Sequence, residues 1–407
     1  MKVERIVFIH PFLLHYHFPR LQALAEECHQ AGISFHSIQL AGYADSYRAL
    51  FENVERKLNN ITLFPEQSLE SIPTNKVWSS LKTKLEELRP DVVFIYGYSL
   101  GIMRRVRFWA ASNKIAVVLI SDSNEFDRAR YGIFEFIKSL FVSRVDAAFV
   151  GGTSSSLYLQ MLGLAQERIV FGYDVIDNRA FYQQAEENRR TLARVLRKWN
   201  LPQHYFLYVG RLIKEKNIWW LLGAYEKYAK SIGEEAVPWS LVICGSGPEE
   251  EELRRYINNT SSQFGESTFF YGLVKQPDII DFYAGASCFV LPSISESWGL
   301  VINEAMACGL PVLASRRVGC AADLVKDGVT GWLFDPYDID ALAGLMVDVH
   351  RLDNSARIEV GMRGQRLICE WGLEKFSQGA LESAQIALRH DRQSQDYLIR
   401  VPIPIRR

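Results

Sequence analysis

Two glutamates with seven residues between them, Glu296 and Glu304, lie on either side of the point where an apolar strand gives way to a helix. The backbone N–H groups of Gly299, Leu300 and Val301 fall at the start of that helix. Such amides have no partner within the helix, and together with the helix dipole they attract anions. Because glycine also lets an anion approach the backbone closely, this segment predicts a diphosphate site.

The two glutamates suit different parts of a ligand bound through a diphosphate. Glu304 lies about one and a half turns into the helix, where a carboxylate can accept hydrogen bonds from ribose hydroxyls, as acidic residues do in dinucleotide folds. Glu296 lies nearer to the place of a sugar. Taken alone, either glutamate is more often a solvated or capping residue. The strand, loop and helix around them favour ligand binding.

Two cations follow another apolar strand. Arg211 and Lys216 come after Gly210 and before a helix, and we expect both to hold the diphosphate. Negative charge grows on a phosphate as its bond to a sugar breaks, so cations aimed at it lower the barrier. For Arg211 alone a structural ion pair is an equally good interpretation, and Lys214 is interpreted as a solvated surface charge.

Two further loops follow strands of the same predicted sheet. Gly245 and Gly247 form a tight turn between a strand and a helix, a feature common to many parallel sheets. Val274 lies where a loop backbone could pair with the edge of a nucleobase, and the alternative is that it only packs.

Taken together, residues 205–350 resemble the C-terminal domain of the family 4 retaining glycosyltransferases of the GT-B fold. The motifs that carry the resemblance are Gly210-Arg211 with Lys216, Gly245-Ser246-Gly247-Pro248, Glu296 with Glu304, Ala307-Cys308-Gly309-Leu310-Pro311-Val312, and Asp327-Gly328 with Gly331.

The resemblance implies a hexosyltransferase that retains the anomeric configuration, uses a UDP- or GDP-sugar as donor, and needs neither a cofactor nor a metal ion. It assigns the lysine and arginine to the diphosphate, the first glutamate to the donor sugar and the second to the ribose. The catalytic residues expected on this basis are Glu296, Arg211 and Lys216. The expected donor-binding residues are Gly210, Arg211, Lys216, Gly245, Gly247, Val274, Glu296, Ser297, Gly299, Leu300, Val301 and Glu304.

Over residues 1–180 the resemblance is mainly architectural. The family's glycine pair in the first loop is replaced by a segment with three histidines, residues 10–19. Where the family often has a histidine, this chain has Asp122. The acceptor-side candidates are therefore His15, His17 and Asp122. Each histidine is as readily a satisfied loop or core residue, and no acidic or cysteine companions at metal-ligand spacing accompany them.

Asp338 and Asp340 match the Asp-x-Asp pattern with which other sugar transferases hold a metal ion. They fall at the start of a helix, where an aspartate most often caps the first turn. We therefore expect a cap here.

Short apolar runs alternate with helical segments, which predicts two Rossmann-like α/β domains facing each other across a cleft. We expect an acceptor-binding domain at 1–180, a polar linker at 181–204, a nucleotide-sugar-binding domain at 205–360, one helix at 361–389 packing back towards the N-terminal domain, and a tail at 390–407. The expected strands are residues 5–9, 34–39, 92–96, 116–121, 147–150, 168–171, 205–209, 240–244, 268–271, 288–291, 311–314 and 331–334.

Composition limits the classes of molecule that this protein is expected to bind. The net charge of −1 argues against nucleic acid, which requires a broad excess of Lys and Arg. No apolar run approaches the roughly 20 residues that cross a bilayer, and the first residues lack the pattern of a secretory signal. We therefore expect a cytoplasmic protein without a transmembrane segment, either soluble or peripheral to the membrane. The run Arg104, Arg105 and Arg107 is usually a solvated face; contact with an anionic acceptor or a lipid headgroup is the alternative.

The resulting hypothesis is transfer of a sugar to an acceptor hydroxyl of a small molecule, a saccharide or a lipid-linked unit. Two alternatives remain open at this stage: a nucleotide-sugar epimerase or isomerase of the same fold, and a non-catalytic nucleotide-sugar-binding protein. The sequence leaves the oligomeric state open.

Overall fold

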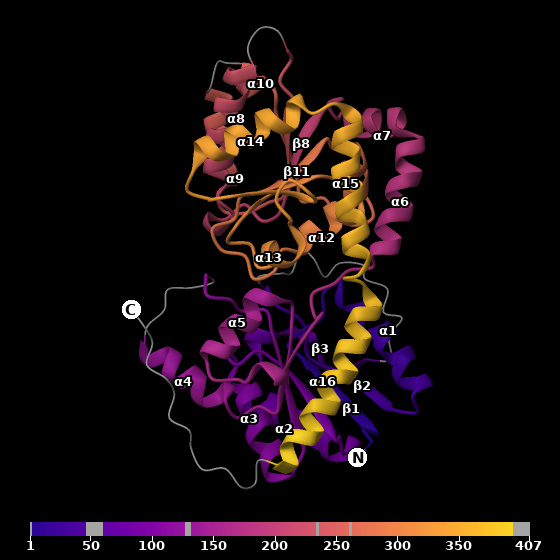
Figure 1. Cartoon of the computed structure of the whole chain (residues 1–407). Helices are drawn as coiled ribbons and strands as arrows, with labels where there is room; N and C mark the ends of the chain where they lie inside the picture. The colour runs from indigo at the N-terminus through magenta and orange to yellow at the C-terminus, as the bar shows by residue number, and fades with distance from the viewer. Residues whose placement is uncertain (1, 46–59, 127–131, 233–235, 260–262, 394–407) are drawn as a thin grey trace. The chain divides into compact units, whose positions relative to one another are not determined.

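The computed structural model describes residues 2–45, 60–126, 132–232, 236–259 and 263–393 (Figure 1). Their backbone contacts divide the chain into two units. The first unit contains the described residues up to Glu125, from Gly132 to Asp177, and from Trp371 onward. The second contains Asn178–Glu370 together with Phe126. Each unit is a parallel sheet covered by helices, as the alternation of apolar runs predicted.

The sheet of the first unit has seven parallel strands in the order β3-β2-β1-β4-β5-β6-β7. The strands are β1 (Arg5–His10), β2 (Ser34–Tyr43), β3 (Asn60–Ser68), β4 (Val92–Tyr96), β5 (Ala116–Ser121), β6 (Ala147–Val150) and β7 (Ile169–Phe171). The helices are α1 (His17–Gln30), α2 (Thr74–Leu88), α3 (Gly101–Ser112), α4 (Gly132–Val142), α5 (Thr153–Met161) and α16 (Leu373–Gln393). Short 3-10 turns lie at Leu69–Ser71 and Gln166–Arg168.

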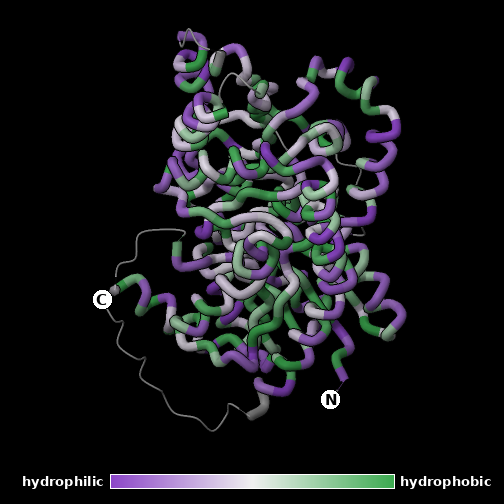
Figure 2. The backbone as a smooth tube through the Cα atoms, turned by 45° about the horizontal axis from the view of Figure 1, so that its top comes forward, coloured by the Kyte–Doolittle hydropathy of each residue, from purple (hydrophilic) through white to green (hydrophobic). Residues whose placement is uncertain are grey.

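Helices bury both faces of this sheet. On one face, apolar side chains of α1 and α16 pack against β1, β4, β5 and β6. On the other face, α2, α3, α4 and α5 complete a second apolar cluster. Covering on both faces explains why the central strands are almost uninterrupted apolar runs. In Figure 2 these hydrophobic strands are green, whereas the helices around them combine green and purple residues.

The sheet of the second unit has six parallel strands in the order β10-β9-β8-β11-β12-β13. The strands are β8 (Tyr205–Val209), β9 (Ser240–Cys244), β10 (Thr268–Gly272), β11 (Cys288–Leu291), β12 (Val312–Ser315) and β13 (Gly331–Phe334). The helices are α6 (Asn178–Arg190), α7 (Leu192–Trp199), α8 (Ile218–Ile232), α9 (Glu250–Asn259), α10 (Gln263–Glu266), α11 (Ile279–Gly285), α12 (Leu300–Ala307), α13 (Ala321–Leu324), α14 (Ile339–Arg351) and α15 (Asn354–Cys369). A 3-10 turn lies at Lys214–Lys216.

Each strand order contains one switch point, where the chain leaves one side of the sheet and continues on the other. It lies between β1 and β4 in the first unit and between β8 and β11 in the second. In open parallel sheets, the loops at the carboxyl ends of these two strands diverge and leave room for a ligand. The topology therefore directs attention to the loops after β1, β4, β8 and β11.

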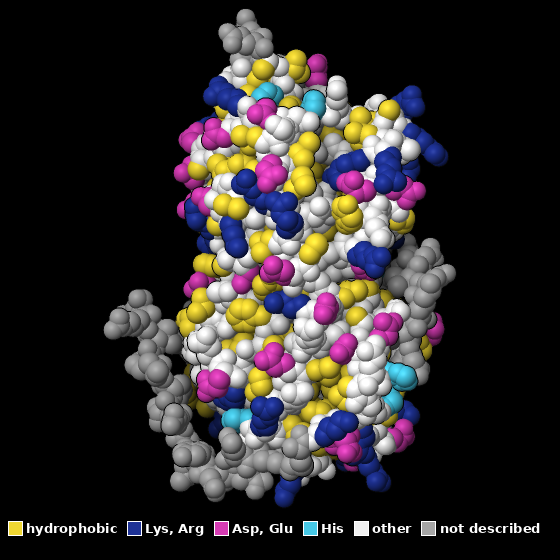
Figure 3. Space-filling view, turned by 45° about the vertical axis from the view of Figure 1, so that its right-hand side comes forward, with side chains coloured by type: hydrophobic (Ala, Val, Ile, Leu, Met, Phe, Trp, Pro, Cys, Tyr) yellow, Lys and Arg dark blue, Asp and Glu magenta, His cyan; other side chains and the backbone are white. Residues whose placement is uncertain are grey.

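The segment expected to be a linker is instead a helical part of the second unit. Residues 181–204 supply most of α6 and all of α7, and these helices pack on α11 and α12. Figure 3 shows one face of the molecule, on which positive and negative side chains are interspersed. Charged residues of this kind do not by themselves distinguish a linker from a helix packed on the domain. Here several of the polar residues face inward.

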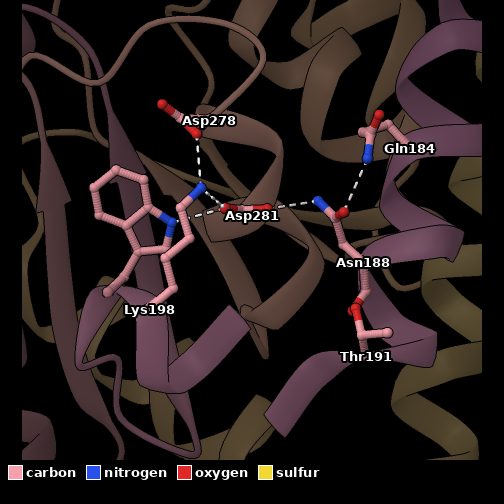
Figure 4. A network of polar contacts seen from close by, with 7 residues as sticks. Gln184, Asn188, Thr191, Lys198, Asp278 and Asp281 are labelled. Carbon is pink, nitrogen blue, oxygen red and sulfur yellow. Dashed lines mark hydrogen bonds and ion pairs between the residues drawn. The ribbon is translucent and has the colours of Figure 1, made fainter. Parts of the chain in front are cut away.

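A polar network holds α6 and α7 to α11 (Figure 4). The buried carboxylate of Asp281 accepts hydrogen bonds from Asn188 Nδ2 at 2.8 Å, Lys198 Nζ at 2.8 Å and Trp199 Nε1 at 2.7 Å. Lys198 also pairs with Asp278 at 2.8 Å. Because a buried carboxylate is costly unless its oxygens are paired, this network fixes the two helices to the unit.

The single helix expected at 361–389 is two helices. α15 ends at Cys369 and belongs to the second unit, whereas α16 begins at Leu373 and packs against α1, β5 and β6 of the first. Gly372 and its neighbours break the helical run. Of the expected tail, residues 390–393 continue α16, and 394–407 lie outside the described residues. No helix in the described part of the chain has the length and apolar content to cross a membrane.

Candidate active site

The loops after β8 and β11 are joined at the switch point of the second unit. The Ile294 N–H donates to the carbonyl of Glu215 at 2.9 Å. Asn217, which is buried and has a left-handed backbone, donates from Nδ2 to the carbonyls of Pro292 at 3.3 Å and Pro336 at 2.9 Å. These bonds fix the path of the loop that carries Arg211 and Lys216 relative to the loop that carries Glu296.

Lys216 and Glu296 form an ion pair across these loops. Both side chains are largely buried, with 12% and 15% of their surface exposed, and Ser293 Oγ donates to the same carboxylate oxygen at 3.4 Å. The two residues that the sequence assigned to the diphosphate and the sugar therefore meet at one point. A partly desolvated ammonium group here offers a fixed positive charge to an anionic ligand.

Tyr208 lies in β8, just before the loop that carries Arg211 and Lys216, and sequence reasoning missed it. Its hydroxyl donates to the carbonyl of Arg211 at 2.9 Å, and its side chain is fully buried. Burial raises the pKa of Tyr208 well above its usual value; the charge of Glu296 raises it further and that of Arg211 lowers it. Both charged groups therefore lie close enough to act on the same phenol. The only signal in the sequence is a tyrosine two residues before Gly210.

Gly245 and Gly247 allow the loop after β9 to lie close to the backbone of the loop after β8. A Cβ on Gly245 would lie 1.8 Å from the carbonyl oxygen of Gly210, and one on Gly247 would lie 2.3 Å from that of Leu212. The Gly210 N–H donates to Cys244 at 3.0 Å, and the Leu212 N–H donates to Ser246 at 2.9 Å. The pairing of β8 and β9 thus continues into their loops, and only glycine fits there.

The loop from Glu296 to Gly299 is fixed in a similar way. The Gly319 N–H donates to the carbonyl of Glu296 at 3.0 Å, and the Cys320 N–H donates to that of Trp298 at 3.0 Å. A Cβ on Gly319 would lie 1.8 Å from the carbonyl oxygen of Ser297, a half-buried residue. Gly319 could not be singled out from the sequence, because its contact is with a loop some twenty residues away in the chain.

Gly299 occupies the cap position of α12 with φ of 97°, a conformation that disfavours side chains. A Cβ there would also lie 2.9 Å from Val318 Cγ1. Leu300 and Val301 begin the helix, and both are half-buried. The expected helix start is therefore confirmed, with its first amides at the carboxyl end of β11.

Glu304 lies in α12, where it accepts a hydrogen bond from Tyr283 Oη at 2.8 Å. Burial raises the pKa of Glu304 to about 7, and the hydrogen bond from Tyr283 opposes that rise. Tyr283 lies on α11 and is fully buried. A carboxyl group with this pKa exchanges readily between donating and accepting a hydrogen bond near neutral pH.

Val274 lies two residues beyond β10 and is half-buried. The Gly245 N–H donates to the carbonyl of Gly272 at 2.7 Å, which links the loop after β10 to the loop after β9. Gly272 has φ of 68°. The loops after β8, β9, β10 and β11 are therefore consecutive along one edge of this sheet.

In the first unit, the three acceptor-side candidates differ in what they contact. His17 is buried, and its Nδ1 accepts a hydrogen bond from the Leu14 N–H at 2.9 Å, so it is a satisfied structural histidine. His15 is half-buried, and burial lowers its pKa. Asp122 follows β5 and accepts a hydrogen bond from Tyr96 Oη at 3.3 Å. Of the three, His15 and Asp122 have side chains with surface left for a ligand.

A buried polar cluster at the switch point of the first unit was not predicted. Arg20 donates from Nε to the carbonyl of Val175 at 2.7 Å and lies 3.5 Å from the carboxylate of Asp174. Burial raises the pKa of Asp174 to about 7, and Arg20 opposes the rise. His10 ends β1, and burial lowers its pKa to about 3, so the ring is neutral. The only sequence signal was an arginine on the apolar face of α1.

The Asp-x-Asp segment is a helix cap, as expected. Asp338 Oδ1 accepts a hydrogen bond from the Ala341 N–H at 2.8 Å, and Asp340 pairs with Lys227 at 2.5 Å. Among the described residues, no three His, Cys, Asp or Glu side chains are grouped closely enough to hold a metal ion.

Residues 191–357 match the family described as glycosyl transferases group 1. The sulfoquinovosyl transferase SQD2 of Arabidopsis thaliana is 33% identical over 136 residues, which are 33% of this chain and 24% of that protein. The segments aligned with the first curated relatives cover less than half of the length of those proteins. All of the residues that match this family lie in the second unit.

Solved structures are similar over nearly the whole chain. A glycosyltransferase from Rickettsia africae ESF-5 superposes with a TM-score of 0.73 at 13% identity, covering 96% of this chain and 100% of that chain. Anabaena Alr3699/HepE, in complex with UDP and glucose, gives a TM-score of 0.69 at 17% identity, covering 94% and 99%. The expected GT-B fold is confirmed.

Proposed function

We propose that this protein moves a hexose from a nucleoside diphosphate sugar to an acceptor hydroxyl, with retention of the anomeric configuration and without a metal ion. The observation that carries the proposal is the meeting of Lys216 and Glu296 beside the first amides of α12. This arrangement offers fixed donors to a diphosphate and a carboxylate to the sugar next to it.

The roles of the donor-side residues follow from charge. Lys216 and Arg211 stabilise the negative charge that develops as the bond between the sugar carbon and the phosphate oxygen breaks. Glu296 holds Lys216 in place before the donor binds and accepts hydrogen bonds from sugar hydroxyls afterwards. Glu304 serves the ribose, and its pKa of about 7 lets it do so in either protonation state.

The acceptor oxygen attacks the sugar carbon from the face that the phosphate leaves. A new bond between carbon and acceptor oxygen forms as the old one breaks, and the departing phosphate oxygen takes the acceptor's proton. This route needs no strong protein base, which suits a first unit in which His10 and His17 are buried. We propose that the acceptor, a small molecule, a saccharide or a lipid-linked sugar, is held on the side of Asp122 and His15.

The donor is best tested first by thermal unfolding in the presence of UDP, GDP and their hexose conjugates. A nucleotide that binds only the folded state at about 100 times its Kd stabilises that state by about 2.7 kcal/mol. UDP is the first choice because the similar fold of HepE holds it. We expect one nucleotide to raise Tm and the other to raise it much less.

Catalysis is tested with matched lysines from one loop. Lys216→Met should lower kcat about 100-fold or more, since removal of one group that stabilises developing charge typically costs that much. Lys214→Met changes an exposed lysine two residues away and should retain the rate. Equal rates in the two variants would disprove the role of Lys216.

The products separate transfer from rearrangement of the donor. Incubation with donor alone should yield the unchanged nucleotide sugar or slow hydrolysis, and NMR of the product made with acceptor should show the anomeric configuration of the donor. A rearranged nucleotide sugar in the absence of acceptor would instead favour an epimerase. Inverted product would overturn the retaining mechanism while leaving sugar transfer intact.

A further inference from the structure

Helix α4 of the first unit exposes apolar side chains and buries polar ones, which is the reverse of an ordinary surface helix. Its outward positions are all apolar: Ile133, Phe134, Phe136, Ile137 and Leu140 are 70%, 57%, 49%, 53% and 38% exposed. A surface helix of a globular protein normally turns such residues towards the core and its polar residues outward. The outward face of α4 therefore has a use other than contact with water.

The polar residues of α4 point inward and are satisfied there. The carboxylate of Glu135, which is buried, accepts a hydrogen bond from Tyr158 Oη of α5 at 2.8 Å and pairs with Lys138 Nζ at 2.6 Å. Phe141 and Val142 anchor the same side of the helix in the apolar core. The orientation of α4 is thus fixed by specific contacts, so its apolar residues are held outward.

The neighbouring helices extend the apolar surface. Phe108 of α3 and both Leu157 and Met161 of α5 are more than half exposed. Eight of the sixteen exposed large apolar side chains in the described part of the chain lie on α3, α4 and α5. These three helices lie side by side in Figure 1, and Arg107 Nη2 of α3 donates to the Arg144 carbonyl just beyond α4 at 3.4 Å. We call their outward side the α3–α5 surface.

The charges on the three helices of this surface are mostly positive. Helices α3, α4 and α5 contain Arg104, Arg105, Arg107 and Lys138, and their only acidic residue is the inward Glu135. Arg144 follows α4 and is exposed, with Nη1 donating to the Leu140 carbonyl at 2.5 Å. This local excess of positive charge contrasts with the net charge of −1 for the chain.

We infer that the α3–α5 surface docks on an anionic phospholipid bilayer. A helix with aliphatic and aromatic residues on one face and arginines beside them lies in the plane of a membrane interface, with the apolar face among the acyl chains and the cations at the headgroups. A protein partner fits less well, because protein interfaces carry about one hydrogen bond per 100–200 Å² and the outward positions of α4 offer no polar side chain. Opposite charge favours anionic lipid.

The chain path places this surface near the acceptor side of the same unit. Asp122 lies just after β5, and α4 begins ten residues later. Because α4 starts at the carboxyl edge of the sheet, Ile133 and Phe134 lie towards the edge at which ligands bind in parallel sheets. A bilayer docked there would bring lipid headgroups to the side of the unit on which Asp122 lies.

The test is co-sedimentation of the full chain with unilamellar vesicles of phosphatidylcholine containing 30% phosphatidylglycerol, and with vesicles of phosphatidylcholine alone. We expect the wild-type protein to bind the anionic vesicles, and binding to fall several-fold between 50 and 500 mM NaCl, because salt shortens the range of charge attraction. The assay contains no donor or acceptor, so its result is independent of the proposed transfer activity.

Matched variants identify the surface. Ile133→Glu with Ile137→Glu should lower vesicle binding at least tenfold. Ile358→Glu with Met362→Glu makes the same change at two similarly exposed positions one turn apart on α15 and should bind as the wild type does. Circular dichroism and Tm confirm that both double variants are folded.

Charge is tested with Arg104→Gln and Arg144→Gln, each of which should weaken binding to anionic vesicles about fivefold, since a cation near such a surface contributes about 1 kcal/mol. Three results would overturn the inference. The wild-type protein could stay in the supernatant with both vesicle types, or the two glutamate double variants could bind vesicles equally well. The third is a wild-type protein that binds no vesicles and forms a dimer, which the double variant Ile133→Glu with Ile137→Glu dissociates.

Discussion

The two units share one plan, a parallel sheet with a single switch point, and they differ in what holds the ligand edge together. In the second unit the edge is built from backbone: glycines at 245, 247 and 319 allow consecutive loops to hydrogen bond to one another. In the first unit backbone bonds of this kind also occur, such as that from the Ala41 N–H to the Pro11 carbonyl at 3.1 Å, but the edge contains in addition a buried cluster of side chains, with Arg20 and Asp174 beside His10.

This difference explains why the two halves resemble known proteins to such different extents. A loop held by backbone hydrogen bonds needs glycine at fixed spacing, so its pattern is short and local. A cluster of side chains from distant segments can be rebuilt in many ways for different ligands. The unit with the backbone-built edge is the one that matches the glycosyltransferase family.

The largest effect that tests this contrast is the loss of a buried charge from the first unit. Arg20→Met leaves Asp174 buried without its cation and should destabilise the first unit by about 3–5 kcal/mol. Arg5→Met, at a partly exposed pair with Asp91, should cost less than about 1 kcal/mol. Urea unfolding gives the loss, and hydrogen exchange with mass spectrometry assigns it to a unit. A small effect of Arg20→Met would remove the contrast.

Gly245→Ala tests the backbone-built edge of the second unit. The added methyl group would meet the Gly210 carbonyl, so we expect a loss of about 1–3 kcal/mol and a marked fall in donor affinity. Gly344→Ala, where nothing lies within 4 Å of the added atom, should instead stabilise α14 by up to about 1 kcal/mol. Donor binding measured by calorimetry should be unchanged in Gly344→Ala; normal affinity in Gly245→Ala would contradict the backbone model.

The smallest expected effect is a pH dependence that isolates Glu304. Its pKa is raised from 4.5 to about 7, so the folded protein binds more protons than the unfolded chain between these values. The free energy of unfolding of the wild type, measured relative to Glu304→Gln, should therefore fall as pH rises from about 4.5 to 7 and level off above 7. The slope should not exceed about 1.4 kcal/mol per pH unit.

The control for this titration is Glu251→Gln, on the exposed side of α9. The wild type measured relative to that variant should show no such slope. If the difference in free energy of unfolding between the wild type and Glu304→Gln also did not change with pH, the carboxyl group of Glu304 would not be desolvated in solution.

Most strands could be predicted because each is a short apolar run that helices cover on both faces. β3 was missed: Asn60–Ser68 includes Pro65, Glu66 and Gln67, and such residues are tolerated only because this strand lies at the edge of the sheet. The helices at 181–204 were interpreted as a linker because their charged residues look solvated in sequence, whereas Asn188 and Lys198 pair with Asp281.

On the donor side, spacing was sufficient to bring Lys216 and Glu296 into one prediction. It could not find Tyr208, Tyr283 or Gly319, because their contacts depend on which loops become neighbours in the folded sheet. On the acceptor side the three histidines attracted attention, yet the structure satisfies His17 locally, and Arg20 reaches Asp174 across 154 positions of sequence. Long-range pairs of this kind leave no local pattern.

The division of the chain has a consequence for its synthesis. The second unit is almost entirely one continuous stretch, whereas the sheet of the first unit is covered by α16, which is synthesised after the second unit. Until Phe376, Ala380 and Ala384 arrive, an apolar sheet face stays open, and exposed surface of that kind promotes aggregation. We therefore expect the first unit to complete its folding after the second, and a chain cut after residue 370 would lack the helix that covers this face of the first unit's sheet.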